Sequence, residues 1–129
     1  MKKFPILSNI KSLNDSFNRL SETESIPSTN VASGAFATLA RITVPANGYY
    51  LLDADLSFDP GTGIRILMVD VSETDANSAI NSVLAEGRAT MQKIRMLRLT
   101  TSDTIYIRAY QNTGSTMSIG GSYRLLRLR

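Results

Sequence analysis

The chain has 129 residues, of which 43% are hydrophobic and 19% charged, so it fits one folded domain with its own core and excludes a disordered chain. It contains neither cysteine nor histidine, which excludes disulfides, thiolate or zinc sites and histidine-based acid–base chemistry. The net charge is +3, and the basic excess lies after residue 64. This distribution fits an anionic partner, but it also fits arginines that alternating strands point into water.

The first part of the chain predicts an amphipathic helix. Its apolar side chains recur at steps of four and three residues: Ile6, Ile10, Leu13, Phe17 and Leu20. This is the spacing of a coiled-coil seam over only two heptads, and one helix packed on its own domain explains it equally well. An isolated helix of this length is marginal in water, so we expect residues 1–25 to anchor or oligomerise the protein.

The amino terminus carries Lys2 and Lys3 before an apolar run, as a secretion signal does, but the run ends at Ser8. Such a run is too short for the apolar part of a signal, and no stretch of about 18 apolar residues follows. We therefore expect neither classical secretion nor membrane insertion.

The remainder, residues 26–129, predicts an all-β head domain. Residues 21–30 are polar, contain Pro27 and indicate a connector. After it, short apolar runs are broken by Gly, Pro, Asn and Asp at intervals of about ten residues, as in all-β proteins. The predicted strands occupy residues 34–44, 49–58, 64–71, 83–89, 90–100, 104–112, 113–122 and 123–129. Roughly eight strands indicate an antiparallel jelly-roll sandwich, preceded by the short N-terminal α-helix.

Two of these strands differ in their patterning. Residues 49–58 alternate, so that Tyr50 and every second residue to Phe58 face the core, whereas Asp53 and Asp55 face water. Residues 64–71 are apolar on both faces. Such a strand needs a second sheet or a neighbouring subunit on its far side, which is a first indication of a partner.

The stretches TVPANGYYLLDADLSF and LRLTTSDTIYIRAYQNTGSTMSIGGSYRLLRL resemble the trimeric jelly roll of tumour necrosis factor and the complement globular heads. The matching positions lie within residues 36–129: Gly48, Tyr50, Leu97, Leu99, Asp103, Ile105, Ile107 and Tyr123 to Leu128. Small versions of this head are similar to domains of bacteriophage fibres, baseplates and capsid decorations. The chain departs from the family in lacking a collagen-like stalk and a disulfide, and in having Leu52 where a Phe is usual.

The resemblance implies a homotrimer, with an apolar surface along the threefold axis contributed by one sheet of each subunit. The doubly apolar strand and two tyrosines of a later strand are the candidates for this interface: Leu67, Val69, Val71, Tyr106 and Tyr110.

Catalytic groups are not evident in the sequence. Asp53 and Asp55 form a carboxylate pair, and Asp70, Glu73 and Asp75 cluster near the next strand end. Without a calcium-loop pattern, solvated acids are the favoured interpretation of both. No glycine-rich loop leads from a strand into a helix, and no serine has a basic partner. We therefore predict no enzymatic activity, no metal and no cofactor.

Basic and aromatic residues in the second half allow a nucleic-acid hypothesis. The set resembles the surface of an oligonucleotide-binding barrel: Arg88, Lys93, Arg95, Arg98 and Arg108 with Tyr106 and Tyr110. Tyr106, Arg108 and Tyr110 share one strand face, and tyrosine and arginine are equally favoured in protein interfaces. Nucleic acid is therefore the less favoured partner.

Together these features favour a non-enzymatic virion structural protein, a trimeric head, fibre or decoration displayed on a bacteriophage particle. It would be assembled in the bacterial host cytoplasm and join the larger virion assembly through its N-terminal segment. Its partner would be a glycan or protein of the host surface, bound by avidity. The alternatives are a receptor-binding baseplate head with a specific saccharide site and an oligonucleotide-binding β-barrel.

Overall fold

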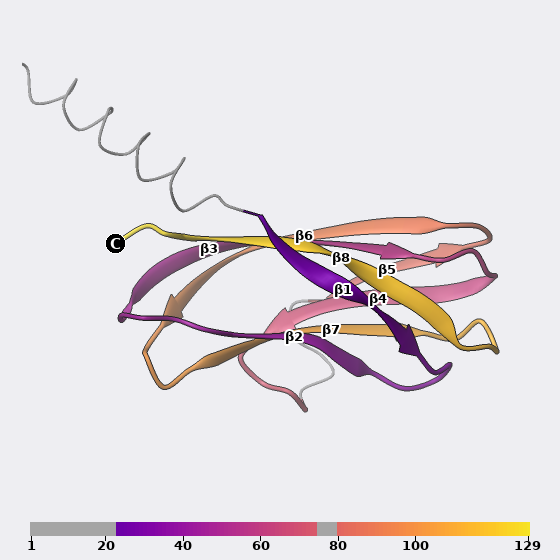
Figure 1. The fold of residues 1–129 in the computed structure, drawn as a ribbon, viewed down its shortest axis with the longest axis horizontal. Helices are drawn as coiled ribbons and strands as arrows, with labels where there is room; N and C mark the ends of the chain where they lie inside the picture. Colours follow the sequence, from indigo (N-terminus) through magenta and orange to yellow (C-terminus); the bar gives the residue numbers. More distant parts are fainter. Residues whose placement is uncertain (1–22, 75–79) are drawn as a thin grey trace, which may run out of the picture.

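The computed structural model of the protein describes residues 23–74 and 80–129, the side chains of residues 80–82 excepted. Within these ranges the chain forms eight strands and no helix that is long and apolar enough to cross a membrane. The strands, which Figure 1 follows in chain order, are β1 (Glu24–Val31), β2 (Ala37–Thr43), β3 (Gly48–Phe58), β4 (Gly63–Asp70), β5 (Ile80–Ala85), β6 (Ala89–Leu99), β7 (Thr104–Gln111) and β8 (Met117–Arg127). The predicted helix lies outside the described residues.

The strands form two four-stranded antiparallel sheets. One, here called the β3 sheet, has the order β1-β8-β3-β6, and the other, the β7 sheet, has the order β2-β7-β4-β5. The chain crosses to the opposite sheet at every connection except that between β4 and β5. This is the strand order of an eight-stranded jelly roll, so the predicted fold class of the head is confirmed.

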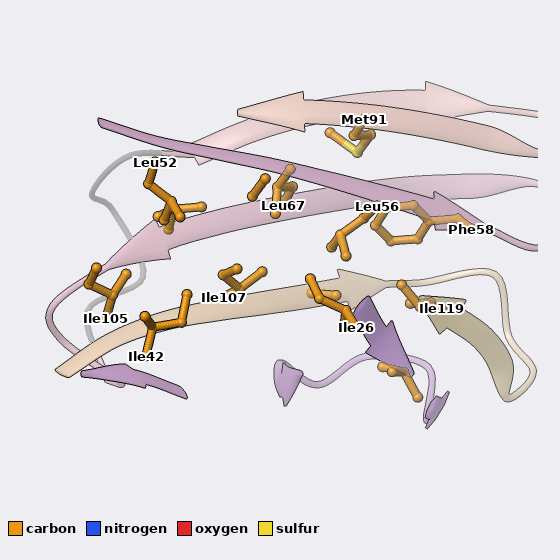
Figure 2. Packing of buried hydrophobic residues seen from close by; sticks show 14 of the residues in the cluster. Ile26, Ile42, Leu52, Leu56, Phe58, Leu67, Met91, Ile105, Ile107 and Ile119 are labelled. Carbon is orange, nitrogen blue, oxygen red and sulfur yellow. The ribbon is translucent and has the colours of Figure 1, made fainter. Parts of the chain in front are cut away.

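The core lies between the two sheets, where Figure 2 shows the buried side chains gathered. The predicted alternation of residues 49–58 is confirmed, since every second side chain of β3 from Tyr50 to Phe58 is buried. They meet buried side chains of the β7 sheet, among them Leu67 of β4 and Ile107 of β7. Burying one large apolar side chain stabilises the fold by about 1.5–3 kcal/mol, so this layer is the main source of its stability.

The predicted connector over residues 21–30 is wrong, because β1 begins at Glu24 and pairs with β8 at the edge of the β3 sheet. Its sequence is polar because only Ile26 and Val31 are buried, and the rest of the strand faces solvent. Pro27 sits where the register shifts, between Ile26 and Thr29, a position on an edge strand that tolerates the missing N–H. The predicted head boundary at residue 26 therefore falls inside a strand.

The prediction of two strands over residues 113–129 is also wrong, since β8 runs unbroken through Gly120 and Gly121. These glycines let neighbouring strands come close. A Cβ at Gly120 would press on the backbone of Ser28 in β1, and one at Gly121 would collide with the main-chain oxygen of Asp55 in β3. A further difference is β5, which begins at residue 80, where the sequence predicted a strand from residue 83.

Candidate functional site

The outer face of the β3 sheet carries a stripe of apolar side chains that the domain's own core does not use. In β6, Ile94 is 55% exposed and Met96 is 64% exposed. Met96 pairs in register with Leu51 of β3, which pairs in turn with Leu126 of β8. We call Leu51, Ile94 and Met96 the apolar stripe; Leu126 beside it is only 6% exposed. Large apolar side chains that gather on one exposed face mark an interaction surface.

The predicted carboxylate pair lies at the border of this stripe, on the same face of β3. Asp53 pairs with Ile94 across the strands and accepts a hydrogen bond of 2.9 Å from Nε2 of Gln92. Burial raises the pKa of Asp55, and the negative charge of Asp53 raises it further, while Arg124 opposes the shift. The two acids are half-buried, so the expectation of freely solvated carboxylates describes them only in part.

An open depression of about 290 Å³ lies at the end of the same face. Tyr49 and Arg98, which face each other across β3 and β6, line it together with Arg129. The ring centroid of Tyr49 lies 5.9 Å from the guanidinium carbon of Arg98 and 5.1 Å from that of Arg129. Two cations are therefore held around one aromatic ring.

The rim of the depression is fixed by hydrogen bonds between segments that are distant in the sequence. The side-chain oxygen of Asn47 accepts from the N–H of Thr101 at 2.9 Å, and its main-chain oxygen accepts from Arg127 at 2.7 Å. The N–H of Tyr49 donates to the main-chain oxygen of Arg129 at 2.7 Å. A Cβ at Gly48 would collide with that same oxygen, so the close approach of the two segments requires glycine.

Tyr106, Arg108 and Tyr110 lie on the outer face of the β7 sheet, as the alternation of β7 predicted. They do not form an open surface on which bases could stack. The guanidinium of Arg108 is nearly buried and lies 4.7 Å from the ring centroid of Phe36, which packs on Tyr110 at 5.1 Å. Arg41 lies 6.0 Å from the ring centroid of Tyr106. Side chains of this chain therefore already occupy ring faces that bases would stack on.

Acidic side chains balance the cations of this second face. Glu73 accepts hydrogen bonds from Oγ1 of Thr38 at 2.9 Å and from Nη2 of Arg41 at 2.7 Å. The hydrogen bond from Thr38 lowers the pKa of Glu73, and the hydrogen bond and charge of Arg41 lower it further. Asp70, almost buried, accepts from Nη1 of Arg95 at 3.1 Å.

The predicted acidic cluster is thus divided between two ion pairs, and its third member, Asp75, lies outside the described residues. Within residues 23–74 and 80–129, no three His, Cys, Asp or Glu side chains gather in a way that would hold a metal. Asp70 pairs with Arg95 of β6, and Glu73 pairs with Arg41 of β2.

The predicted trimer-interface residues are scattered by the fold. Leu67 and Val69 are fully buried in the domain's own core, because the second sheet covers this face of β4, so they have no surface to offer a subunit. Val71 is 44% exposed just after β4, and Tyr106 and Tyr110 are partly exposed. The predicted anchor residues Ile6, Ile10, Leu13, Phe17 and Leu20 lie outside the described residues.

The predicted basic surface is also divided. Arg95 is paired with Asp70, and Arg88 lies 3.5 Å from a carboxylate oxygen of Asp59. Arg108 belongs to the outer face of the β7 sheet, whereas Arg98 lines the depression on the β3 sheet. These cations therefore do not form one continuous surface.

Arg65 is a structurally important residue that the sequence pattern did not reveal. Its side chain points inward from β4 and is fully buried. The guanidinium donates hydrogen bonds of 2.6–3.3 Å to five main-chain oxygens, those of Asp59, Gly61, Gly63, Ala85 and Gly87. One buried cation thus ties the β3–β4 loop to the β5–β6 loop, which is how the charge is compensated away from water.

No protein-family model and no curated protein matches the sequence. Among solved structures, the chain is similar to a carbohydrate-binding module of Cellvibrio mixtus lichenase 5A in complex with cellotriose, with 13% identity and a TM-score of 0.35 over 85% of this chain and 88% of that one. It is also similar to the module TmCBM61 in complex with β-1,4-galactotriose, with 15% identity and a TM-score of 0.37 over 78% of this chain and 70% of that one. Neither is a tumour necrosis factor-like or bacteriophage protein.

Proposed function

We propose that the protein is a non-enzymatic head domain that forms a homotrimer through the outer face of the β3 sheet and is displayed on a bacteriophage particle. The apolar stripe carries the first part of this proposal. The core between the sheets is complete without it, so the exposure of Ile94 and Met96 is not explained by packing within the chain. Burying such side chains against a second copy removes them from water.

The threefold state follows from the resemblance to trimeric jelly rolls, in which one sheet of each subunit faces the axis. Both sheets expose apolar side chains, but their surroundings differ. On the β3 sheet, Ile94 and Met96 of the edge strand β6 lie beside Leu51 of β3. On the β7 sheet, exposed Leu84 lies on the edge strand β5, and Arg41 and Glu73 form an ion pair on the outer face. We therefore propose an interface on β6, β3 and β8, in place of the residues of β4 and β7 that the sequence suggested.

The absence of a catalytic role is supported by how the acidic side chains are used. Asp70 and Glu73 are held in ion pairs, and Asp53 is hydrogen-bonded to Gln92. A general acid or base must instead be free to reach a reacting group on a substrate. The head is consequently a surface for binding.

The virion role and the attachment to a host surface rest on the resemblance to phage fibre, baseplate and decoration heads. Residues 1–22 precede β1 and contain the apolar seam, so they are the segment available to join a larger particle. Assembly in the bacterial cytoplasm agrees with the expected lack of secretion. Threefold repetition multiplies weak contacts with a host glycan or protein.

One alternative gains support from a specific feature, the depression at Tyr49, which suits a head with a saccharide site. The oligonucleotide-binding barrel gains none, since the aromatic rings of the β7 sheet are already covered by arginines and the cations are divided between surfaces.

The mass of the full-length protein in solution tests the central part of the proposal. Native mass spectrometry is expected to give three times the 14.1 kDa of one chain. A monomer at micromolar concentration would overturn it. The particle role is tested by deleting residues 1–22, which should leave the trimer but prevent its incorporation into the particle; normal incorporation would contradict the anchor.

A further inference from the structure

We propose that the depression at Tyr49 is a binding site for an acidic saccharide, with the guanidinium groups of Arg98 and Arg129 holding its oxyanion. The two groups lie 5.9 and 5.1 Å from the ring centroid of Tyr49 and line the same depression. A carboxylate, sulfate or phosphate group placed there would receive charge-assisted hydrogen bonds from both sides.

The arginines of this site differ in their partners from the three ion-paired arginines of the described chain. Arg41, Arg88 and Arg95 each lie within ion-pair distance of a carboxylate. In the part of the chain that the structure describes, no acidic side chain lies that close to Arg98 or Arg129. Guanidinium groups gathered without an anion repel one another, and an anionic ligand would relieve that repulsion.

One carboxylate near the depression, that of Asp103, keeps its negative charge, but it does not pair with Arg98 or Arg129. It accepts hydrogen bonds from the N–H and hydroxyl of Thr100, at 2.8 and 3.2 Å. A main-chain oxygen of Arg129 accepts from the N–H of Tyr49. A third guanidinium, that of Arg127, is held at the rim by Asn47. The balance around the depression is therefore positive, and it favours an anion.

The rim is preorganised, which reduces the conformational cost of binding. Asn47 is bonded on one side to Thr101 and on the other to Arg127, so hydrogen bonds link the turn before β3, the β6–β7 hairpin and the end of β8. A ligand would meet these segments already in place. Rigid sites of this kind keep more of the interaction energy as affinity.

The size of the site and the neutral groups around it favour a saccharide. About 290 Å³ lies just below the usual range of ligand pockets, roughly 300–1,000 Å³, so it suits one charged unit of a polymer. Thr100 and Asn47 line the same depression, and hydroxyl and amide groups are partners for sugar hydroxyls, although the Thr100 hydroxyl also bonds Asp103 and the Asn47 side-chain oxygen also accepts from Thr101. Nucleic acid requires cations spread along several phosphates, whereas here they gather at one end of one sheet.

The inference rests on the proposed function only for the source of the ligand, an acidic polymer of a host surface. Its failure and the failure of the trimer are distinguishable, since the binding site is built within one subunit. A monomeric protein that binds acidic saccharide would refute the trimer alone, and a trimer that binds none would refute the site alone.

The test is a titration of the ¹⁵N-labelled full chain at 0.15 M salt with a galacturonic acid oligosaccharide, and with a neutral galactose oligosaccharide of the same length. The acidic ligand should move the amide signals of Gly48, Tyr49 and Leu99, and the neutral one should bind at least about tenfold more weakly. Arg98→Gln and Arg129→Gln should each weaken acidic-ligand binding at least about tenfold. Arg88→Gln removes the same charge at an exposed position away from the depression and should leave binding unchanged.

Five results would overturn the proposal, the last of which comes from the phosphate control. The first three are equal affinity for the acidic and neutral oligosaccharides, full binding by Arg98→Gln, and signal changes confined to the β7 sheet. The fourth is tighter binding of a single-stranded oligonucleotide that is lost in Arg98→Gln, which would assign the site to nucleic acid. Inorganic phosphate is the final control, and it should bind more weakly than the acidic oligosaccharide. Equal affinity would mean that the site recognises a free oxyanion, which would contradict the proposal of a saccharide site.

Discussion

Met96 of β6 lies opposite Leu51 of β3 on the outer face of their sheet, yet Met96 is 64% exposed. The inner face of the same strand pair is closed, since Leu97 and Leu52 are buried in the core. Where a strand pair carries apolar side chains on both faces but only one face is covered, as at Met96 and Leu51, the second face offers a surface for association. This relationship underlies the proposed trimer.

Replacement of Arg65 by methionine tests the role of the buried cation. The substitution removes every hydrogen bond that the guanidinium makes to the two loops and leaves their main-chain oxygens without this donor. Losing a buried, charge-assisted network should lower the free energy of unfolding by about 3 kcal/mol or more. Urea denaturation followed by circular dichroism measures the change.

The control for this variant is Arg41→Met, since Arg41 is exposed and its ion pair with Glu73 lies at the surface. Its cost should stay below about 1 kcal/mol. If Arg65→Met proved no more destabilising than Arg41→Met, the bridging of the two loops would not contribute to stability.

Gly121→Ala tests the close approach of β8 to β3. A Cβ at this position would collide with the main-chain oxygen of Asp55, so the strands would have to separate locally. We expect a loss of about 1–3 kcal/mol, as for overpacked sites. Thermal unfolding of the purified variant measures it.

Gly87→Ala is the matched control, because a Cβ there meets nothing within 4 Å and the backbone is not in the left-handed region. This variant should be as stable as the parent or slightly more stable. Equal melting temperatures for all three proteins would mean that β8 does not need glycine at position 121.

Thr38→Val tests the hydrogen bond that contributes most to the lowered pKa of Glu73. The substitution should raise that pKa toward its ordinary value, as measured by an NMR titration of the side-chain carboxyl. Because the folded-state pKa of Glu73 is depressed, its contribution to stability is complete above the unfolded-state pKa and is lost as the pH falls through the folded-state pKa. The parent should therefore exceed the variant in stability at neutral pH, and this advantage should shrink in acid.

Thr43→Val serves as the control on the same strand, because the side chain of Thr43 is exposed. The hydrogen bonds of Glu73 come from Thr38 and Arg41, so this variant keeps them. Its Glu73 titration should match that of the parent. An unchanged pKa of Glu73 in Thr38→Val would show that the charges of Arg41 and Arg108 lower it without Thr38.

The sequence predicts the fold best where buried and exposed side chains alternate regularly along a strand. The alternation from Tyr50 to Phe58 indicated β3 correctly, since the apolar or polar character of each side chain shows whether it faces the core or the solvent. β1 was missed because only Ile26 and Val31 report burial, and Pro27 is tolerated at a register shift on the edge. β8 was divided because Gly120 and Gly121 suggested a break, whereas they permit close packing.

The candidate site was less predictable because it depends on cross-strand neighbours. Strand 64–71 correctly indicated a covering layer, but only the fold shows that the second sheet supplies it for Leu67 and Val69. The depression joins Tyr49, Arg98 and Arg129, which are far apart in the sequence. The alternation of residues 90–100 did carry a signal: Ile94 and Met96 fall on the face opposite to Leu97 and Leu99.

The most direct test of the account compares the native mass of the full chain with those of Met96→Glu and Leu84→Glu. Leu84, on β5 of the other sheet, is 75% exposed, so both variants place one carboxylate at an exposed apolar position. The account predicts a trimer for the parent and for Leu84→Glu, and a folded monomer for Met96→Glu, with folding checked by circular dichroism. A parent that is monomeric, or a Met96→Glu variant that remains trimeric, would contradict it.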